Sequence, residues 1–426
     1  MIQLIFLKDF NIMSTMRRLF AATCGNFIEW YDFALYLFLA PVMAHQFFPE
    51  QSHQTALLGA LTMYAVSFFF RPLGAIIFGH LGDVYGRRIA LRWSLSLLAG
   101  LSIAISLLPT YQSIGFWAPV FLCLCRIGQG ICLGGEFAGS MVYLAESAPV
   151  QQQAFMSSMS NNGSNFGILV ASGSAALLSS LMGDALFEQL GYRLLFFFGG
   201  LVGLLGFSWR NDIQETTAFL EREKAIDVPL KYVIQFNKKE LLRLFLILSI
   251  SAVGSYGFIG SLSMYLQQSL ELSMSQALSY ETQFIALTLL LVPCCAWIAD
   301  RVSPKRMFEH ACFGYLILAV PIFFMYLQFK NPLYLLPLLL IYCMEQASTP
   351  ALMCSFFPAA YRYTAVSLAY NTAMALIGGL SPLLVQLIFN SRDSEWSIAC
   401  LLIGSSLLAL ISLAWKKQKV LLVPGN

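Results

Sequence analysis

Charge is scarce in this chain. Lysine, arginine, aspartate and glutamate make up only 11% of its 426 residues, whereas hydrophobic residues make up 58%. A soluble protein of this size would expose far more lysine and glutamate. Apolar runs of about twenty residues, the length with which a helix crosses a bilayer, recur from end to end. The alternating pattern of a membrane β-barrel is missing, because the runs are continuous. The sequence therefore predicts an all-α membrane protein.

The motifs of pumps, channels and enzymes are also missing from the sequence. No GxxxxGK[ST] phosphate loop is present, which argues against ATP-driven transport, and no Arg-rich voltage-sensor helix or carbonyl-lined filter sequence occurs. The ten cysteines form no CxxC pair, and the four histidines lie at span ends or in loops. We therefore expect no enzyme activity, no metal, no cofactor and no nucleic-acid partner. A secondary transporter is the remaining class.

Twelve membrane-spanning helices are predicted from the apolar runs. They cover residues 19–44, 55–79, 89–109, 117–143, 155–181, 193–209, 241–268, 280–300, 307–328, 334–355, 363–390 and 395–415. An even number places both termini on one side of the membrane. Lysine and arginine gather on the side that carries the termini, and only Arg193, Lys330 and Arg392 fall on the other. Because positive residues favour the cytoplasm, we expect both termini to be cytoplasmic.

The spans fall into two halves. A six-helix bundle at 19–209 and another at 241–415 are separated by a polar cytoplasmic linker at 210–240, and shorter cytoplasmic segments are expected at the two ends, 1–18 and 416–426. The loop "GHLGDVYGRR" follows the second span, and a weaker copy, "AWIADRVSPK", follows the eighth. Matching loops in two six-helix halves predict pseudo-two-fold symmetry and a central cavity between the halves.

Several pieces of the sequence resemble one transporter family. "GHLGDVYGRR" is similar to the loop signature of the major facilitator superfamily, and "GNFIEWYDF" looks like the first helix of its metabolite:proton symporters. Further similar pieces are "FFFRPLGAIIFGHLGD", "RIGQGICLGGEFAG", "GYRLLFFFGG" and "FPAAYRYTAVSLAYN". Members of that family carry α-ketoglutarate, shikimate, citrate, or proline and betaine. The resemblance thus implies the major facilitator fold, but it does not identify a substrate.

Two acids and one arginine are expected at the middle of the membrane. Glu29 and Asp32 lie three residues apart on nearly the same face of the first span, and Arg126 lies at similar depth in the fourth. A charge at the centre of a helix costs about 2.5–3.5 kcal/mol on insertion scales, so we expect one of the acids to pair with Arg126. An anion that bound Arg126 would release this acid to take up a proton. The resemblance also associates this arginine with proton transfer, although a static ion pair remains the alternative.

Further candidate residues surround this pair. Arg71 in the second span needs either an acid of the first span or a substrate carboxylate as partner, and Arg193 either meets substrate or reaches lipid headgroups. Glu345, in the span that matches the fourth, is either a second proton site or a neutral hydrogen-bonded acid. Asn162, Tyr256, Tyr370 and Asn371 are candidates for a cavity lining, with hydrogen bonding between helices as their alternative role. Tyr31 and Tyr36 are candidates for an aromatic wall of the site, with a position facing lipid as the alternative.

A gate is predicted at the cytoplasmic ends of the helices. Asp83, Arg87 and Arg88 of the loop motif are expected to form a latch that holds the halves shut. Glu136 and Glu146 are its expected acidic partners, with Asp300 as the matching acid of the second half. Glu136 lies about 15 Å from Arg126 along the helix, which places it toward the cytoplasm.

These features favour a proton-coupled symporter in a cell membrane, of the bacterial inner-membrane kind. Its expected partners are protons, the lipid bilayer and a small polar solute, either a carboxylate or a zwitterion such as proline or betaine. We expect it to work as a monomer by alternating access. An exporter of the same fold, with a larger and more apolar cavity, is the alternative, and a sensor without transport activity is a third.

Overall fold

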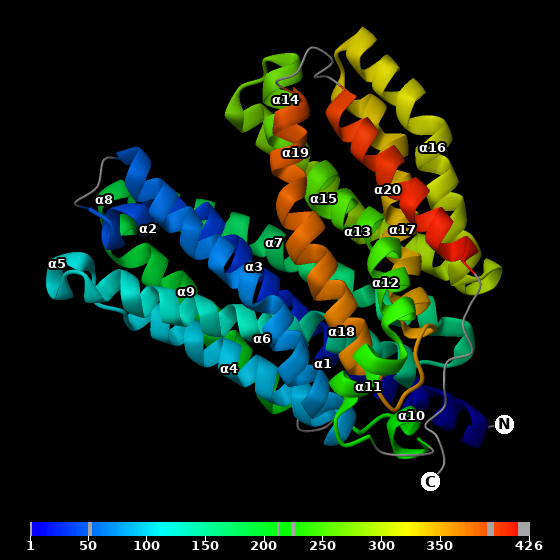
Figure 1. The fold of residues 1–426 in the computed structure, drawn as a ribbon. Coiled ribbons are helices and arrows are strands. Elements are labelled where there is room, and N and C mark those ends of the chain that lie inside the picture. Colours follow the sequence, from blue (N-terminus) through cyan, green and yellow to red (C-terminus); the bar gives the residue numbers. More distant parts are fainter. Residues whose placement is uncertain (1, 50–52, 211–212, 223–225, 390–395, 416–426) are drawn as a thin grey trace. The chain divides into compact units, whose positions relative to one another are not determined.

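The computed structural model describes residues 2–49, 53–210, 213–222, 226–389 and 396–415, and the side chains of 2–18, 53, 54 and 184 are not described. Every regular element within these ranges is a helix (Figure 1). The chain divides into two units. The first comprises residues 1–147 and 159–221, and the second comprises 148–158 and 222–426. The predicted tail at 416–426, together with parts of the linker, lies outside the described residues.

The first unit contains the helices expected of the N-terminal half. They are α1 (Ile2–Phe38), α2 (Ala40–Phe47), α3 (His53–Val84), α4 (Arg87–Leu107), α5 (Tyr111–Ile114), α6 (Trp117–Ser147), most of α7 (Gln153–Met182), α8 (Asp184–Leu186), the π-helical η2 (Phe187–Gly191), α9 (Tyr192–Trp209) and α10 (Thr217–Leu220). Within it, α3 packs on α6, and α4 packs on both α6 and α9.

The second unit contains the remaining helices and the first residues of α7. They are η1 (Val150–Gln152), α11 (Pro229–Phe236), α12 (Lys238–Ile247), α13 (Ser249–Ala252), the π-helical η4 (Val253–Ile259), α14 (Leu262–Leu270), α15 (Met274–Val302), α16 (Pro304–Phe329), η5 (Pro332–Leu335), α17 (Leu336–Cys354), α18 (Arg362–Ala373), the π-helical η6 (Met374–Gly378), α19 (Gly379–Phe389) and α20 (Ser397–Ala414). Here α17 packs on α15 and α16, and α20 packs on α16.

The number of apolar helices agrees with the prediction. Eleven stretches of the described chain are long and apolar enough to cross a membrane, and α1 with α2 would make a twelfth. These two helices meet at an angle of 66° at Leu39, and Pro41 lies in the first turn of α2. A proline has no N–H to continue the hydrogen bonds of the preceding helix, so it suits this position. The all-α membrane fold is confirmed.

Two predicted spans are irregular in the structure. The seventh (241–268) is divided among α12, α13, η4 and α14, and the eleventh (363–390) among α18, η6 and α19. The two π-helical segments contact each other. A Cβ on Gly378 of η6 would lie 2.6 Å from the ring of Tyr256 in η4, so only glycine leaves room for this contact. Apolar periodicity alone did not predict these breaks, because both sides of each break are equally apolar.

Glycine allows α3 and α6 to approach closely. A Cβ on Gly130 would lie 2.2 Å from the carbonyl oxygen of Ser67, and one on Gly134 would lie 2.1 Å from that of Arg71. Small residues permit such backbone contact between membrane helices. The close contact fixes the positions of Arg71 and Arg126 relative to each other.

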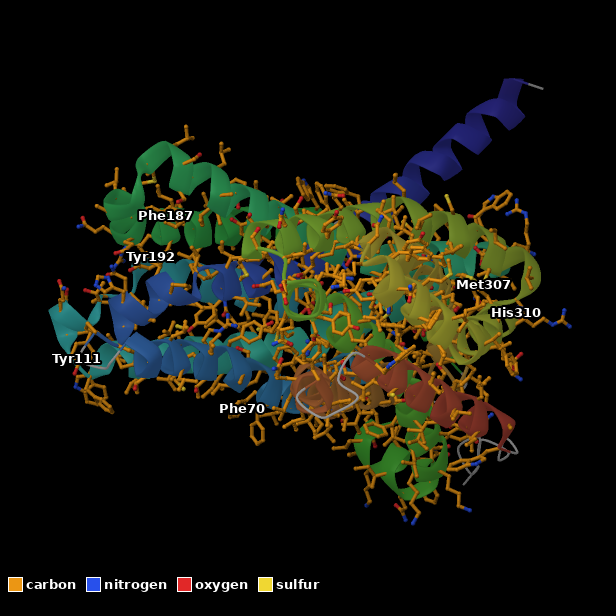
Figure 2. All side chains as sticks on the ribbon, turned by 90° about the horizontal axis from the view of Figure 1, so that it is seen from above. Phe70, Tyr111, Phe187, Tyr192, Met307 and His310 are labelled. Carbon is orange, nitrogen blue, oxygen red and sulfur yellow. The ribbon has the colours of Figure 1, made fainter. Side chains whose placement is uncertain are left out.

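A buried aromatic and aliphatic cluster packs the first unit at one end. Phe187 and Tyr192 lie next to each other in it (Figure 2), and the ring of Tyr192 meets that of Phe47 edge to face at 6.5 Å. Tyr31 and Tyr36 of α1 belong to the same cluster. Large apolar side chains such as Phe69 are exposed on the outside, as expected where lipid is the solvent. The polar residues described below therefore lie in an apolar bundle.

Candidate functional site

Asp32 and Arg126 are brought together inside the first unit. Both side chains are buried, and Nη1 of Arg126 lies 3.8 Å from Oδ2 of Asp32. Asp32 also accepts hydrogen bonds from Ser102 of α4 and, at 2.6 Å, from Nε2 of Gln129 of α6. The predicted pairing of one acid with Arg126 is thus present, and Asp32 is the acid involved. Its role in proton transfer stays a prediction.

The guanidinium of Arg126 is only partly satisfied by protein groups. Nη1 donates a 2.6 Å hydrogen bond to Oε1 of Gln129, whereas Nε and Nη2 make no hydrogen bond within the described part of the chain. The ring of Tyr36 lies 4.1 Å from the guanidinium and that of Phe33 5.7 Å. Two adjacent N–H groups beside aromatic faces match the fork geometry with which arginine binds a carboxylate.

Glu29 lies in a different environment from Asp32. Its carboxylate is completely buried, and Oε1 lies 4.0 Å from Nη2 of Arg71 in α3. Neither oxygen of Glu29 has a hydrogen-bond partner among the described residues. The Arg71 guanidinium also lies 5.5 Å from the ring of Phe68. An acid of the first span is therefore the neighbour of Arg71, which was one of the two predicted possibilities.

The two tyrosines predicted to line the site are both buried. The hydroxyl of Tyr31 donates to the carbonyl of Leu195 at 3.2 Å, and that of Tyr36 donates to the carbonyl of Ala60 at 3.1 Å. Of these two tyrosines, Tyr36 is the one whose ring contacts the guanidinium of Arg126. Tyr31 therefore packs the bundle, and Tyr36 offers the site its aromatic face but not its hydroxyl.

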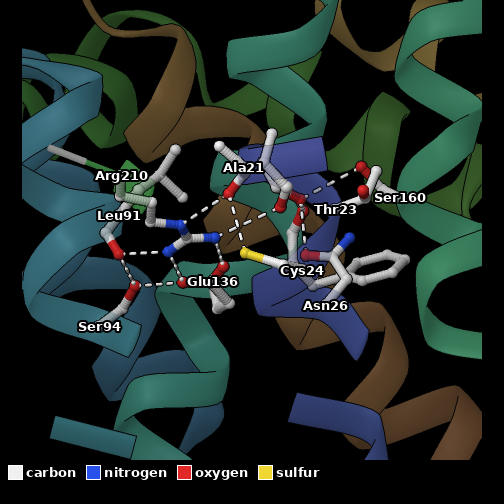
Figure 3. A network of polar contacts seen from close by, with 12 residues as sticks. Ala21, Thr23, Cys24, Asn26, Leu91, Ser94, Glu136, Ser160 and Arg210 are labelled. Atoms are coloured by element: carbon white, nitrogen blue, oxygen red, sulfur yellow. Dashed lines mark hydrogen bonds and ion pairs between the residues drawn. The ribbon is translucent and has the colours of Figure 1, made fainter. Parts of the chain in front are cut away.

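Glu136 has a different partner from the one predicted. We expected it to bind Arg87 or Arg88, but it pairs with Arg210 at the end of α9 and accepts a hydrogen bond from Ser94 (Figure 3). The prediction of this contact is wrong. Arg210 is completely buried and also donates to the carbonyls of Ala21 and Leu91. Its guanidinium thus ties α1, α4 and α6 to the end of α9.

The loop motif forms an ion-pair cluster within the first unit. Arg87 Nη1 lies 2.9 Å from Oδ1 of Asp83, and Nε and Nη2 each donate to Glu146 at 3.1 Å. The predicted contact between Arg87 and Glu146 is confirmed. The carboxylate of Glu215, from the predicted linker, accepts from the backbone N–H of Arg87 and of Arg88 at 3.1 and 3.2 Å. A carboxylate at the N-terminus of α4 satisfies N–H groups that have no partner inside the helix.

Asp300 has a similar capping role in the second unit. Its two carboxylate oxygens accept from the backbone N–H groups of Ala154 and Phe155, in the first turn of α7, at 2.7 and 2.9 Å. Asp300 is one residue from Arg301, whose guanidinium lies over the ring of Trp297 instead. The acid of the second loop therefore binds a helix end, whereas Asp83 binds an arginine side chain.

Glu345 is fully hydrogen-bonded and has no basic partner among the described residues. It accepts hydrogen bonds from Ser251, from Thr349 at 2.5 Å and from Gln346 at 2.9 Å. Its side chain is completely buried in α17. Both predicted alternatives, a proton site and a neutral hydrogen-bonded acid, are compatible with these three donors.

The remaining predicted lining residues are found in α7, α9, η4 and α18. Arg193 donates to the carbonyl of Ser106 at 2.9 Å and lies over the ring of Tyr192. The amide of Asn371 donates to the carbonyl of Ser367, one turn back in α18. Asn162 is half-buried in α7, Tyr370 is buried in α18, and the Tyr256 ring packs on Gly378. Their role in binding a solute stays a prediction.

Comparison with known proteins identifies the family. The sequence profile of the Major Facilitator Superfamily matches residues 22–382. The chain belongs to the major facilitator superfamily. Members of this superfamily are transporters rather than enzymes.

Curated members of the superfamily match over almost the whole chain. A proline/betaine transporter of Salmonella typhimurium is 30% identical over 92% of this chain and 81% of its own length. A glycine betaine/proline/ectoine/pipecolic acid transporter of Dickeya dadantii is 29% identical over 93% of this chain and 82% of its own. The shikimate transporter of Escherichia coli is also 29% identical, over 94% of both chains. The predicted family resemblance is confirmed.

Solved structures agree on the major facilitator fold. The proton:xylose symporter XylE superimposes with a TM-score of 0.76 at 18% identity, over 94% of this chain and 95% of XylE. The human organic anion transporter MFSD10 superimposes with a TM-score of 0.68 at 16% identity, over 94% of this chain and 99% of its own. At such low identity these structures inform the fold alone.

Four polar residues of this superfamily member contribute to the clusters but were not selected from the sequence. Ser102 and Gln129 bind Asp32, Arg210 binds Glu136, and Glu215 caps α4. Gln129 had a usable signal, since it lies one helical turn after Arg126 in "RIGQG" and must share its face. Arg210 and Glu215 had none, because both belong to a polar stretch that resembles a solvated linker.

Proposed function

We propose that this chain is a proton-coupled symporter that imports a small organic solute bearing a carboxylate. The observation that carries the proposal is that Nε and Nη2 of Arg126, next to buried Asp32, make no hydrogen bond to the described residues. A buried arginine whose N–H groups lack acceptors is costly, so a solute carboxylate that supplied two acceptors would bind well there. The relatives named above support this class of solute, because proline, betaine, ectoine, pipecolic acid and shikimate all carry a carboxyl group.

Asp32 and Arg126 together offer a way to couple the solute to a proton. With no solute bound, ionised Asp32 is the anion nearest to the Arg126 guanidinium. When a solute carboxylate arrives, two anions share one cation, and a proton on Asp32 relieves the repulsion between them. Proton and solute would therefore bind together and leave together. Glu29 and Glu345 are additional acids at which the protein could hold a proton.

The aromatic rings beside Arg126 extend the proposal to zwitterions. The rings of Phe33, Tyr64 and Phe68 form a cluster with centroid distances between 4.3 and 5.5 Å. A quaternary or secondary ammonium group binds to such faces, while the carboxylate of the same solute binds to Arg126. This arrangement supports betaine- or proline-like solutes somewhat more than a dicarboxylate. An exporter is not favoured, since the named relatives carry small polar solutes.

The other proposed properties concern the whole transporter. We place it as a monomer in a cell membrane of the bacterial inner-membrane type, with both termini in the cytoplasm, because lysine and arginine concentrate on that side. The Asp83–Arg87–Glu146 cluster and the cap that Glu215 forms would act as the cytoplasmic gate.

Transport by the purified protein in liposomes tests the proposal. Radiolabelled proline, glycine betaine and shikimate would be offered with an inward proton gradient, and with the gradient collapsed by an ionophore. We expect at least one of the three to accumulate, only when the gradient is present, and to make the external medium more alkaline as it enters. Uptake that is indifferent to the gradient would contradict the proposal. Empty liposomes serve as the control.

A further inference from the structure

The side chain of Gln129 bridges Asp32 and Arg126. The 3.8 Å between Nη1 of Arg126 and Oδ2 of Asp32 is too long for a hydrogen bond. Gln129 bridges the gap: its Oε1 accepts from Nη1 of Arg126 at 2.6 Å, and its Nε2 donates to Oδ2 of Asp32, also at 2.6 Å. Both bonds are shorter and better placed than the direct contact. The amide is therefore the main link between the acid and the guanidinium.

The chemistry of the two neighbours fixes the orientation of this amide. A guanidinium only donates hydrogen bonds, and an ionised carboxylate only accepts them. The amide oxygen of Gln129 must therefore face Arg126, and its nitrogen must face Asp32. The reverse orientation would place two donors against each other on one side and two acceptors on the other. Gln129 is thus held by both partners at once.

Ser102 lets Asp32 change its protonation without disturbing this bridge. The Ser102 hydroxyl donates to Oδ1 of Asp32, and the carbonyl of Leu98 lies 3.2 Å away as a second acceptor. A hydroxyl both donates and accepts. When Oδ1 of Asp32 carries a proton, it can therefore donate a hydrogen bond to the Ser102 oxygen, and the hydroxyl hydrogen of Ser102 turns to the carbonyl of Leu98. Oδ2 of Asp32 remains free of the proton and continues to accept from Gln129.

We infer that Gln129 is a positioning residue that keeps Arg126 available to the solute. The amide prevents Arg126 from closing onto Asp32 as a direct two-bond ion pair, which would occupy N–H groups that the solute carboxylate needs. The buried Nε and Nη2 of Arg126, which make no hydrogen bond to the described residues, are the N–H groups that this arrangement would keep for the solute. The inference rests on the proposed function, since it concerns how the same site presents its arginine.

The first test removes the bridge while preserving its size. Gln129→Met has an unbranched side chain of similar length but forms neither bond, so Arg126 can approach Asp32 directly. We expect KM of the transported compound, among proline, glycine betaine and shikimate, to rise by about tenfold or more, with kcat changed much less. The matched control is Gln268→Met, because Gln268 is exposed in α14 and bonds only to Gln386 among the described residues. An unchanged KM in Gln129→Met would overturn the inference.

The second test exchanges the acid and the amide. In Asp32→Asn, no acid is left at position 32. In Gln129→Glu, two carboxylates face each other. We therefore expect proton-driven accumulation to fall by about tenfold or more in each single variant. In the double variant, the amide now at position 32 would donate to the carboxylate now at position 129. That carboxylate would accept from Nη1 of Arg126, as the amide oxygen of Gln129 does, and would leave Nε and Nη2 for the solute. Ser102 would still donate to the side chain at position 32. We expect the double variant to recover accumulation to within roughly threefold of wild type.

The outcomes separate the inference from the proposed function. Wild-type protein that accumulated none of the three compounds under a proton gradient would overturn both. Wild-type protein that accumulates one of them, together with a double variant no better than its worse parent, would overturn the bridging role alone. Circular dichroism and the elution volume on gel filtration verify that each variant is folded. A merely structural role for Gln129 does not account for recovery in the double variant.

Discussion

At the scale of single residues, Asp32 and Glu29 differ in their hydrogen bonds because their neighbours differ. They lie three residues apart on α1, and both are almost fully buried. Asp32 accepts two hydrogen bonds from neutral side chains, whereas Glu29 accepts none among the described residues. The pairing of an acid with Arg126 was predictable, because charges at the same depth of a membrane must find each other. The choice between the acids was not, because it depends on Ser102 and Gln129, and hydroxyl and amide residues are common in membrane helices for packing reasons alone.

Arg126→Lys tests the fork of the guanidinium. Lysine keeps the positive charge, but it has one ammonium group in place of the planar edge that binds both oxygens of a carboxylate and stacks on Tyr36. We expect KM of the transported compound to rise by about tenfold or more, measured by counterflow without a proton gradient. Arg301→Lys is the control, since Arg301 is exposed on α15 and lies over Trp297. Equal KM values for the two variants would show that Arg126 supplies charge alone.

At the scale of helices, one buried pair lies where α1, α4, α6 and α9 meet. Arg210 and Glu136 fill the space next to α1, and Gly25 leaves room for them. Hydropathy predicted where the helices run but assigned Arg210 to a solvated linker, because it stands at the edge of an apolar stretch. The expected pairing of Glu136 with Arg87 failed for a related reason: depth in the membrane can be read from the sequence, but lateral neighbours cannot. The π-helical breaks in the seventh and eleventh spans were missed because no change in hydropathy marks them.

Gly25→Ala tests this packing. A Cβ at this position would lie 1.9 Å from Oε1 of Glu136 and 2.1 Å from Nη2 of Arg210, so the ion pair must shift. We expect the substitution to lower the free energy of unfolding by about 1–3 kcal/mol, seen as a lower midpoint of thermal unfolding in detergent. Gly100→Ala in α4 is the matched control, because nothing lies within 4 Å of its Cβ and alanine favours a helix. If the midpoint of Gly25→Ala were no lower than that of Gly100→Ala, the Arg210–Glu136 pair would accommodate a Cβ at position 25 without loss of stability.

At the scale of the whole molecule, the loop motif and the linker meet in one cluster, which we propose as the gate. The latch residues Asp83, Arg87 and Glu146 contact each other within the first unit, and Glu215 of the linker caps the helix that carries Arg87. The sequence predicted the first three from their motif and their place at the helix ends. It could not predict Glu215, because a charged residue in a polar stretch usually faces water. The chain that connects the two units thus takes part in the cluster that we propose as the gate.

Loss of the latch should change which side of the membrane reaches the solute site. In the double variant Arg87→Ala, Arg88→Ala, the ion pairs to Asp83 and Glu146 are gone, and the state closed toward the cytoplasm loses their stabilisation. A shift of about 1.4 kcal/mol between two states changes their ratio tenfold. We therefore expect a cysteine introduced at Asn162, in a background without native cysteines, to react several times faster with a membrane-impermeant maleimide applied from the cytoplasmic side. Lys305→Ala is the control, because Lys305 forms an exposed pair with Glu309 that contributes little. If the double variant and the protein with Arg87 and Arg88 were labelled at equal rates from the cytoplasmic side, the latch would be contradicted. The proposed solute site at Arg126 would not be affected by that result.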